Sequence, residues 1–369
     1  MKDYDYMALA IDLAAAAKGQ TSPNPTVGAI VVRNGQIVGI GAHLKAGEPH
    51  AEVHALNMAG EKAKDATIYV TMEPCSHYGK TPPCADLIIR RGIKRVVIAA
   101  QDPNPRVAGS GIAKLREAGL EVETGLLSEK AQQLNEDFDH YIRTKTPYVT
   151  LKTAMSLDGK IATSTGDSKW ITGTEAREDV HRYRHQHDAI LVGVGTVLHD
   201  DPLLTTRIPG GGKHPIRIIL DHHLRTPLNA NVLNDESVET WIVIGGNVPN
   251  EKKSLYRQKH VKLIEMEDGI HLPDLMVRLG KMGISSLFVE GGATVNGSFL
   301  TSKLVHQVII YLSPILIGGN NAPTSFGGGG FQSLHEALQL DITSIEQIGK
   351  DIKLIAKTKR GDGFVHRDY

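Results

Sequence analysis

The sequence predicts an α/β protein of two domains, and three observations support this prediction. The chain has 369 residues, more than one domain of ordinary size requires. Stretches with a helical pattern alternate with short apolar runs in both halves, as in sheets covered by helices. Lys145-Thr146-Pro147 separates a polar helical stretch from a new apolar run. We therefore expect one domain over residues 1–145 and a second over residues 146–369. No internal repeat relates them.

The elements expected in the first half follow from apolar runs, turn residues and helix formers. Asn34-Gly35 is a strong hairpin signal. The run at 95–100 is apolar throughout, as in a strand buried on both faces. In chain order we expect a helix at 4–19, strands at 29–32 and 36–41, a helix after His50, a strand at 67–72, a helix from Cys84, a strand at 95–100, a helix at 109–118, a strand at 120–124 and one polar linker helix at 128–144.

The second half opens with a strand at 148–156. We expect a helix at 174–187, a strand at 188–193, and a buried strand at 286–290 that runs into a glycine turn and a helix. A glycine turn at a helix N-terminus presents free backbone N–H groups to an anion. Neither glycine segment, at 193–196 or at 291–298, has the full dinucleotide fingerprint, so a phosphate site and a tight structural turn both stay open as interpretations.

Metal-binding residue types gather between residues 50 and 84. Glu52 lies two residues after His50, and Pro74-Cys75 is followed by Cys84. One imidazole and two thiolates can bind zinc with the fourth position open, as in a catalytic site. Zinc there lowers the pKa of bound water to about 7, and Glu52 can carry the proton to a leaving amine. This pattern is typical of zinc-dependent nucleobase deaminases.

The spacing of the two cysteines departs from that pattern. Eight residues separate Cys75 from Cys84, where two are usual, and His77 and Lys80 lie in this loop as possible substrate contacts. Both expected helices begin beside ligands, and their positive dipole ends favour thiolate over thiol. A structural zinc site completed by His54 or His77, or a buried cysteine pair with a surface histidine, is the competing interpretation.

Several polar residues lie at the ends of expected strands. Asn24 comes just before the first strand, where its amide could face a pocket or form a turn. Asn104 and Arg106 follow a buried strand, where open α/β sheets place ligands, although a plain turn is equally compatible. The three residues are therefore candidates for substrate contact.

Three charged residues of the second half are each compatible with either a functional or a surface position. Lys152 lies on a strand with apolar neighbours, either as an active-site cation or as a solvated edge charge. Arg184 and Arg207 suit bidentate contacts to phosphate but are also compatible with surface positions.

Composition narrows the class of partner. The formal net charge is zero, so no basic excess is available for a nucleic-acid backbone, and we expect a small-molecule substrate and no nucleic acid. Both cysteines belong to the metal cluster, which fits a reducing compartment. The polar N-terminus is not a signal peptide, and no apolar run reaches the roughly 20 residues that span a bilayer. We expect a cytoplasmic protein without a membrane partner that forms homo-oligomers, either dimers or tetramers.

The whole chain resembles the family of bifunctional riboflavin biosynthesis proteins called RibD, or RibG in some bacteria. In the first half the resemblance rests on the segment 24–28, on His50-Ala51-Glu52, and on the segment 71–75 with Cys84. The wide cysteine spacing is what this family shows. In the second half it rests on segments that follow in the same order, at 152–162, 168–173, 193–196, 200–202 and 290–292.

The resemblance implies a fold and two successive reactions. The N-terminal domain would be a three-layer α/β/α domain similar to cytidine deaminases, and the C-terminal α/β domain would be similar to dihydrofolate reductase. The first would use zinc to deaminate 2,5-diamino-6-ribosylamino-4(3H)-pyrimidinone 5′-phosphate. The second would use NADPH to reduce the ribosyl side chain, giving 5-amino-6-(5-phosphoribitylamino)uracil.

The resemblance also implies roles for individual residues. His50, Cys75 and Cys84 would hold zinc, Glu52 would move the proton, and Lys152 would act at the ribose. The expected cofactor contacts are Ala154, Trp170, Thr196, Asp200 and the turn formed by Gly292, Ala293, Thr294, Val295, Asn296, Gly297 and Ser298. The expected substrate contacts are Ser168, Arg184, Leu204, Arg207 and Glu290.

Two other functions compete with this one. One is a nucleic-acid or nucleoside zinc deaminase with a fused nucleotide-binding domain. A nucleic-acid deaminase would need a basic groove, which the balanced charge does not indicate. The other is a zinc-stabilised binding module joined to a nucleotide-sensing domain, without turnover, which would have a fourth side chain closing the metal site.

Overall fold

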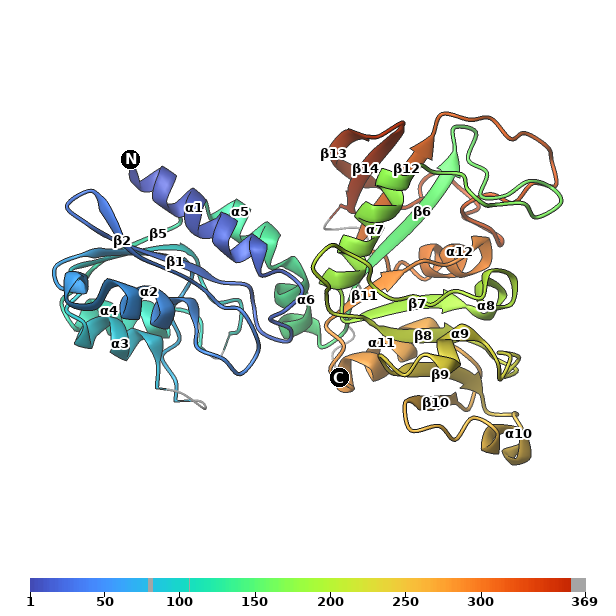
Figure 1. Ribbon diagram of the computed structural model, residues 1–369, viewed down its shortest axis with the longest axis horizontal. Helices are drawn as coiled ribbons and strands as arrows, with labels where there is room; N and C mark the ends of the chain where they lie inside the picture. The colour runs from blue at the N-terminus through green and yellow to red at the C-terminus, as the bar shows by residue number, and fades with distance from the viewer. Residues whose placement is uncertain (79–81, 106, 360–369) are drawn as a thin grey trace. The chain divides into compact units, whose positions relative to one another are not determined.

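The chain divides between Lys145 and Thr146 into two units in the computed structural model, which describes residues 1–78, 82–105 and 107–359. The first unit is a five-stranded sheet with helices on both faces (Figure 1). Its elements are α1 Asp3–Ala16, β1 Gly28–Arg33, β2 Gln36–Ala42, α2 Ala51–Ala59, the 3-10 helix η1 Gly60–Ala63, β3 Thr67–Met72, α3 Cys84–Arg90, β4 Arg95–Ala100, α4 Ser110–Glu117, β5 Glu121–Thr124, α5 Ser128–Leu134 and α6 Glu136–Thr144.

The strand order of this sheet is β2-β1-β3-β4-β5. The strand β1 pairs antiparallel with β2 and β3, whereas β3, β4 and β5 are parallel. An apolar cluster with Leu56, Ile88 and Leu115 lies between the sheet and α2, α3 and α4. A second cluster, with Met7 and Ala131, lies between the sheet and α1 and α5. These two cores confirm the three-layer α/β/α arrangement that the resemblance implies.

A close contact between β2 and α2 positions the metal-binding residues. A Cβ atom at Gly41 would lie 2.2 Å from the carbonyl oxygen of Ala51, so glycine is required for this approach of helix to strand. Ala51 is the first residue of α2. The contact therefore fixes the N-terminus of α2 on the sheet, together with His50 and Glu52 at that end of the helix.

The linker helix expected at 128–144 is two helices. Asn135 separates α5 from α6, with φ −113° and ψ 24°. Its buried side-chain oxygen accepts hydrogen bonds from the backbone N–H and the hydroxyl of Thr26, at 2.8 and 3.1 Å, and its amide donates to the Thr26 carbonyl at 2.9 Å. The prediction of one helix was wrong because this asparagine bonds to distant backbone and leaves helical geometry.

The second unit contains a nine-stranded sheet in the order β10-β9-β8-β7-β11-β6-β12-β14-β13 (Figure 1). The strands from β10 to β12 are parallel to their neighbours, and β14 and β13 continue the sheet antiparallel. Its elements are β6 Tyr148–Ser156, α7 Thr174–Gln186, β7 Ala189–Gly193, α8 Val194–Asp200, β8 Ile216–Leu220, α9 Asn231–Asn234, β9 Thr240–Gly245, α10 Asn250–Ser254, β10 Val261–Met266, α11 Leu272–Lys281, β11 Ser286–Val289, α12 Ala293–Thr301, β12 Gln307–Ser313, β13 Leu340–Ile348 and β14 Asp351–Thr358.

Both faces of the parallel part of this sheet are buried. Alternate residues of β7 enter different apolar clusters: Ile190 packs with the cluster that includes α7 and α8, and Leu191 packs with the cluster that includes α11 and α12. Because these strands are parallel, their carboxyl ends meet at one edge of the sheet, where open α/β sheets bind ligands.

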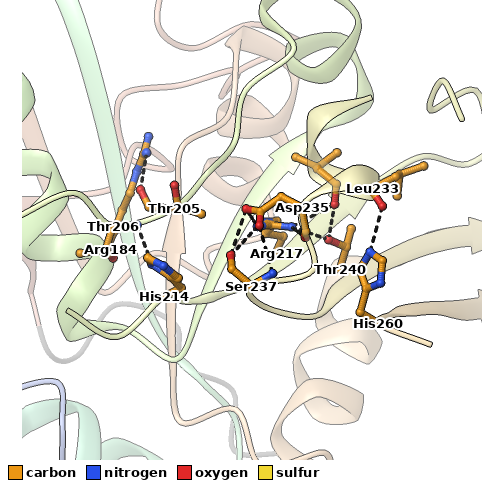
Figure 2. Close-up of polar contacts among 11 residues, drawn as sticks. Arg184, Thr205, Thr206, His214, Arg217, Leu233, Asp235, Ser237, Thr240 and His260 are labelled. Carbon is orange, nitrogen blue, oxygen red and sulfur yellow. Dashed lines mark hydrogen bonds and ion pairs between the residues drawn. The ribbon is translucent and has the colours of Figure 1, made fainter. Parts of the chain in front are cut away.

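A buried arginine near the amino end of β8 stabilises the opposite edge of the sheet, where the amino ends of the parallel strands lie. Figure 2 shows the Arg217 side chain among polar groups of the segment that joins α9 to β9. Its guanidinium donates to the carbonyls of Val232 and Asp235, at 3.0 and 2.8 Å. It also donates to the Thr240 hydroxyl at 3.2 Å and forms an ion pair with the Asp235 carboxylate. Arg217 is fully buried, so these contacts stabilise the sheet.

No helix in the described part of the chain is long and apolar enough to cross a membrane.

Candidate active sites

The three predicted metal ligands come together in the first unit. His50 Nδ1 lies 3.3 Å from Cys84 Sγ and 3.7 Å from Cys75 Sγ. Nitrogen and sulfur ligands of one tetrahedral zinc ion lie about 3.5 Å apart, given metal–ligand distances of about 2.0 and 2.3 Å. The donor set therefore fits zinc in both chemical type and spacing.

Local structure explains why these three side chains meet. His50 is the N-cap of α2, and Cys84 is the first residue of α3. Cys75 lies in the loop after β3, where its carbonyl accepts the Ala85 N–H at 3.1 Å and its sulfur accepts the Cys84 N–H at 3.3 Å. The loop is thus tied to the first turn of α3, which brings the two sulfur atoms to the N-terminus of α2.

The electrostatics of the two thiols favour a cation. The hydrogen bond with Cys84 lowers the pKa of Cys75 to about 4. The same contact, together with burial, raises the pKa of Cys84. One proton therefore leaves the pair readily, while the second is retained. A bound divalent cation is the species that stabilises two thiolates this close together.

Glu52 lies beside this cluster. It is the second residue of α2 and is 3 % exposed. Burial raises the pKa of Glu52 to about 7, and its carboxyl group hydrogen-bonds to Cys84. A carboxyl group whose pKa is near neutral both accepts and donates a proton effectively under physiological conditions. The arrangement can therefore move a proton between a water molecule at the metal and a departing group.

The alternative of a closed structural zinc site has no support in the described residues. His50, Cys75 and Cys84 are the only cluster of potential ligands found within residues 1–78, 82–105 and 107–359. His54 and His77 do not join it, and His77 is exposed. Lys80 and Arg106, two candidate substrate contacts, lie outside the described residues.

His43 was not singled out from the sequence, yet it lies next to the metal ligands. Its ring is 5.3 Å from the ring of His50, edge to face. Its Nδ1 lies 3.2 Å from the Pro49 carbonyl, and its Nε2 lies 3.2 Å from the side-chain nitrogen of Asn24. Asn24 therefore pairs with a histidine beside the site. The available signal was that His43 comes two residues after the strand predicted at 36–41.

A second residue missed from the sequence is Glu73, a buried carboxylate directly before Pro74-Cys75. It accepts hydrogen bonds from four backbone N–H groups, of Asp102, Gly109, Gly111 and Ile112, at 2.8 to 3.2 Å. This carboxylate joins the cysteine loop to the segment at 102–112. Asn104 lies in that segment, in a turn where its N–H donates to the Asp102 carboxylate at 2.8 Å.

The second unit contains a cavity of about 1870 Å³ at the carboxyl edge of its parallel strands. Drug-sized ligands occupy about 300–1,000 Å³, so this cavity has room for more than one such ligand. The predicted site residues that line it are Lys152, Ala154, Ser168, Trp170, Arg184, Thr196, Asp200, Leu204, Arg207, Glu290, Gly292, Ala293, Thr294, Val295 and Ser298.

Two predicted cofactor contacts do not line the cavity. Asn296 is fully buried, and its amide donates to the carbonyl of Ser325 at 3.0 Å. A Cβ atom at Gly297 would lie 2.0 Å from the carbonyl oxygen of Gly327. Both residues face the segment at 325–327 because α12 rotates successive side chains by about 100°. They hold the helix in place while Gly292 to Val295 face the cavity.

Glu290 is the centre of the charged groups in this cavity. Arg184 binds it through two nitrogens, with Nε–Oε1 2.7 Å and Nη2–Oε2 3.2 Å, and Lys152 Nζ lies 3.5 Å from Oε2. Burial opposes ionisation of Glu290, but Arg184 and Lys152 outweigh it and lower its pKa to about 2. Arg184 also donates to the Thr205 carbonyl at 3.2 Å (Figure 2).

The cavity wall near Glu290 carries a positive excess. Lys152, Arg184 and Arg207 are three cations against one carboxylate, and Arg207 forms no ion pair with any residue that the structure describes. Burial and the neighbouring Arg184 lower the pKa of Arg207. An anionic group such as a phosphate monoester would relieve this repulsion, and arginine suits its geometry.

The aromatic ring of Tyr311 contacts the ammonium group of Lys152. Lys152 Nζ lies 6.0 Å from the centre of the Tyr311 ring, within range of a cation–π contact. The Tyr311 hydroxyl donates to Asp179 at 2.7 Å, and Lys353 Nζ binds the same carboxylate oxygen at 2.7 Å. The ring is therefore fixed by a buried ion pair, and the ammonium group is held between this ring and Glu290.

The cavity also fits a dinucleotide cofactor. Gly292 is the N-cap of α12, with extended backbone, and it lines the cavity, so the first N–H groups of this nine-residue helix can bind an anion there. Trp170 is 68 % exposed on the same cavity, with the Arg177 guanidinium 4.6 Å from its ring centre. An anion site and an aromatic wall in one cavity suit phosphates and a flat heterocycle.

Comparisons with known protein families agree with these two sites. Residues 1–100 match the family described as cytidine and deoxycytidylate deaminase zinc-binding region. Residues 147–354 match the RibD C-terminal domain. The two matches fall on the unit that contains the zinc ligands and on the unit that contains the cavity.

Similar proteins extend over nearly the whole chain. The riboflavin biosynthesis protein RibD of Bacillus amyloliquefaciens is 55 % identical over 98 % of this chain and 97 % of its own length. RibD of Escherichia coli K12 is 44 % identical over 96 % and 99 %. The solved structure of a diaminohydroxyphosphoribosylaminopyrimidine deaminase/5-amino-6-(5-phosphoribosylamino)uracil reductase from Thermotoga maritima has TM-score 0.87 and 37 % identity, covering 96 % of this chain and 98 % of that one. Form 1 of Acinetobacter baumannii RibD has TM-score 0.87 and 39 % identity, covering 97 % and 99 %.

Proposed function

The chain belongs to the RibD family, the bifunctional deaminases and reductases of riboflavin biosynthesis, and on this premise we propose how its residues divide the two reactions. Residues 1–145 carry the deamination of 2,5-diamino-6-ribosylamino-4(3H)-pyrimidinone 5′-phosphate. Residues 146–369 carry the NADPH-dependent reduction of the ribosyl side chain, which gives 5-amino-6-(5-phosphoribitylamino)uracil.

In the first reaction, Glu52 is the group that moves protons. Zinc held by His50, Cys75 and Cys84 supplies the Lewis acidity that makes water nucleophilic near neutral pH. The Glu52 carboxylate takes a proton from that water and returns it to the amino nitrogen that leaves. Its position beside Cys84 and its pKa near 7 suit both transfers.

In the second reaction, the chain holds the open form of the ribose and polarises its carbonyl oxygen. NADPH supplies the hydride. Lys152, held between Glu290 and the Tyr311 ring, donates a hydrogen bond to that oxygen and a proton as the alcohol forms. Arg184 and Arg207 bind the substrate phosphate, since they supply the positive excess of the cavity wall.

Further predicted residues complete this division of the cavity. The turn from Gly292 to Val295 takes the cofactor phosphates at the N-terminus of α12. Trp170 forms an exposed aromatic wall for the cofactor. The other proposed cofactor contacts on the cavity are Ala154, Thr196, Asp200 and Ser298, and the other proposed substrate contacts are Ser168 and Leu204.

The observation that supports this proposal most strongly is the meeting of a three-ligand zinc set with a buried carboxyl group at the N-terminus of α2. The test is to give the purified zinc-loaded protein the phosphorylated diaminopyrimidine and NADPH, and to follow ammonia release and NADPH absorbance together. We expect ammonia to be released without NADPH, and NADPH to be oxidised only after deamination. Oxidation of NADPH by the undeaminated pyrimidine would contradict the proposed order.

We also propose that the chain forms a homo-oligomer in a reducing, cytoplasmic compartment. The edge strand β13 exposes Ile342 and Ile345, which are 59 % and 65 % exposed, and an exposed edge strand is a template for pairing. Both cysteines are free, as a zinc site requires. Sedimentation velocity should show a dimer or tetramer, and Ile345→Lys should shift it toward the monomer.

A further inference from the structure

A buried ion pair between α7 and β14 has no part in either proposed reaction. Asp179 of α7 and Lys353 of β14 are each 7 % exposed, and neither lines the cavity. Lys353 Nζ lies 2.7 Å from Asp179 Oδ2 and 3.0 Å from Glu346 Oε1. Burying two such charges costs free energy, and apolar residues in their place are often equally stable. Stability alone therefore does not explain the pair.

One hydrogen bond connects this ion pair to the cavity wall. The hydroxyl of Tyr311, a buried residue that lines the cavity, donates to Asp179 Oδ2 at 2.7 Å. In the sheet, Tyr311 of β12 lies beside Ala154 of β6 on one side and Lys353 of β14 on the other. These residues form a row across one face of the sheet. Lys152, two residues before Ala154, has its side chain on the same face.

The helix that carries Asp179 is also fixed at its N-terminus. Asp351, the first residue of β14, is fully buried, and its carboxylate accepts the Gly173 N–H at 2.6 Å. Gly173 is the N-cap of α7. Lys353 of the same strand binds Asp179 itself. The strand β14 therefore holds α7 at two points, which fixes the Asp179 carboxylate relative to the sheet.

The ammonium group of Lys152 is held only loosely by its carboxylate partner. Its Nζ lies 3.5 Å from Glu290 Oε2, whereas Arg184 binds both oxygens of that carboxylate at 2.7 and 3.2 Å. Its other contact is the Tyr311 ring, whose centre lies 6.0 Å from Nζ. The face of a ring attracts a cation without being a strong hydrogen-bond acceptor, so the N–H donors of the ammonium stay available. The orientation of this ring therefore determines where those donors lie.

We infer that Asp179, with Lys353 as its counter-ion, is a positioning residue for the reduction and acts on Lys152 through the Tyr311 ring. The inference rests on the proposed role of Lys152 as the hydrogen-bond and proton donor to the ribose carbonyl. Without the bond to Asp179 the ring can tilt, and the ammonium group then moves with it. A displacement of about 1 Å at a reacting group can lower turnover by about a hundredfold.

The test measures kcat and KM for reduction of the supplied deaminated pyrimidine by the full-length zinc-loaded protein, below its unfolding temperature. Tyr311→Phe keeps the ring and the buried ion pair but removes the hydroxyl. Its kcat should fall by about tenfold, while KM for the pyrimidine and for NADPH should change by less than about twofold. Asp179→Ala should lower kcat at least as far. Asp179→Asn should lose less, because its amide oxygen still accepts the hydroxyl hydrogen bond.

A double variant distinguishes this role from a purely structural one. If Tyr311 acts through Lys152, Tyr311→Phe should change kcat little in a protein that already carries Lys152→Gln. An equal fall in both backgrounds, or no fall in the wild-type background, overturns the inference and leaves the proposed function intact. If Lys152→Gln alone leaves kcat unchanged, the proposed role of Lys152 fails, and the inference fails with it.

The matched control is Tyr256→Phe, which removes the same hydroxyl from another buried tyrosine. Tyr256 belongs to the same apolar cluster as Tyr311, and its hydroxyl donates to the Thr226 carbonyl at 2.5 Å, but it does not line the cavity. This variant should leave kcat unchanged even where its melting temperature falls. A loss of kcat equal to that of Tyr311→Phe would assign the effect to loosened packing and overturn the inference. Ammonia release by the same samples reports whether the first unit is intact.

Discussion

The zinc site of the first unit and the cavity of the second are built from different lengths of chain. The zinc ligands and Glu52 all fall between residues 50 and 84, and two of the ligands lie at helix N-termini. The cavity takes its lining from residues 152 to 323, at the carboxyl ends of β6, β7, β8 and β11. The first site depends on local spacing, and the second depends on the order of strands in a sheet.

This difference has a physical consequence. In the proposed mechanism each side chain of the zinc site has one task, since the ligands bind the metal and Glu52 moves the proton. In the cavity the tasks are shared, because the single carboxylate of Glu290 binds Arg184 and also holds Lys152. Single substitutions in the first unit should therefore abolish one reaction cleanly, and those in the second should produce graded changes.

The largest expected effect comes from Glu52→Gln. The amide keeps the size of the side chain but cannot take the proton from water, so deamination should fall by about a hundredfold to ten-thousandfold. Zinc content and reduction of supplied deaminated intermediate should not change. The measurements are ammonia release, metal analysis and NADPH oxidation. Glu48 is an exposed carboxylate two residues before His50, so Glu48→Gln is the control and should change none of these three measurements. Loss of both reactions in Glu52→Gln would contradict the separation of the sites.

Next in size is the effect of Arg217→Met on the stability of the second unit. Removing the guanidinium leaves the Val232 carbonyl and the Thr240 hydroxyl without this donor and leaves Asp235 without its cation, which should cost about 3 kcal/mol of unfolding free energy. Thermal unfolding should show a lower midpoint for the second unit, while deamination is unchanged at lower temperature.

The double variant Arg217→Met with Asp235→Leu sharpens this prediction. Removing both charges leaves no unpaired carboxylate, so the double variant should be more stable than Arg217→Met alone. Equal losses in the two proteins would show that the ion pair with Asp235 is not what stabilises this part of the sheet.

The contrast also explains how much could be predicted from the sequence. The helices and strands expected in the first half end within about three residues of those observed, apart from the interruption at Asn135. The metal cluster was found because ligand chemistry limits residue type and spacing. Asn135 could not be found, because its partner Thr26 lies more than 100 residues earlier and no local pattern indicates that pairing.

Less of the second unit could be predicted from the sequence. No element was expected between residues 208 and 285, although β8, β9, β10 and α11 lie there. The position of β8 beside β7 could not be predicted, because strand order is not encoded in local periodicity. The glycine turn at 291–298 was recognised as a motif, but only the fold shows that Asn296 and Gly297 face away from the cavity.

A smaller effect is expected from Glu73→Gln in the first unit. The carboxylate accepts four backbone N–H groups with two oxygens, and an amide would place an NH₂ group against two of these donors. The first unit should lose about 1.5–3 kcal/mol of stability. Because the segment at 102–112 would then be less fixed, KM for deamination should rise more than kcat falls, with zinc content and reduction unchanged. Glu61→Gln, an exposed carboxylate in the same unit, should have neither effect. A fall in zinc content would place Glu73 with the metal ligands instead.

The smallest expected effect is a pH dependence from His181 in the cavity. Burial, with Arg184 and then Arg207, lowers the pKa of His181 to about 4, and its Nδ1 accepts the Arg207 N–H at 3.3 Å. The unfolded chain protonates this residue near pH 6.5, whereas the folded protein resists protonation. Its contribution to stability is therefore complete above about pH 6.5 and is lost as the pH falls toward 4.

His181→Gln should remove this dependence while keeping a polar side chain. Between pH 7.5 and pH 5, the melting temperature of the second unit should fall by a few degrees less in the variant than in wild type. The exposed His335→Gln is the control, because it also removes an imidazole from the second unit but from a residue that does not line the cavity. Parallel pH profiles for wild type and His181→Gln would mean that Glu290 compensates the imidazolium, and that the cavity tolerates a further cation beside its arginines.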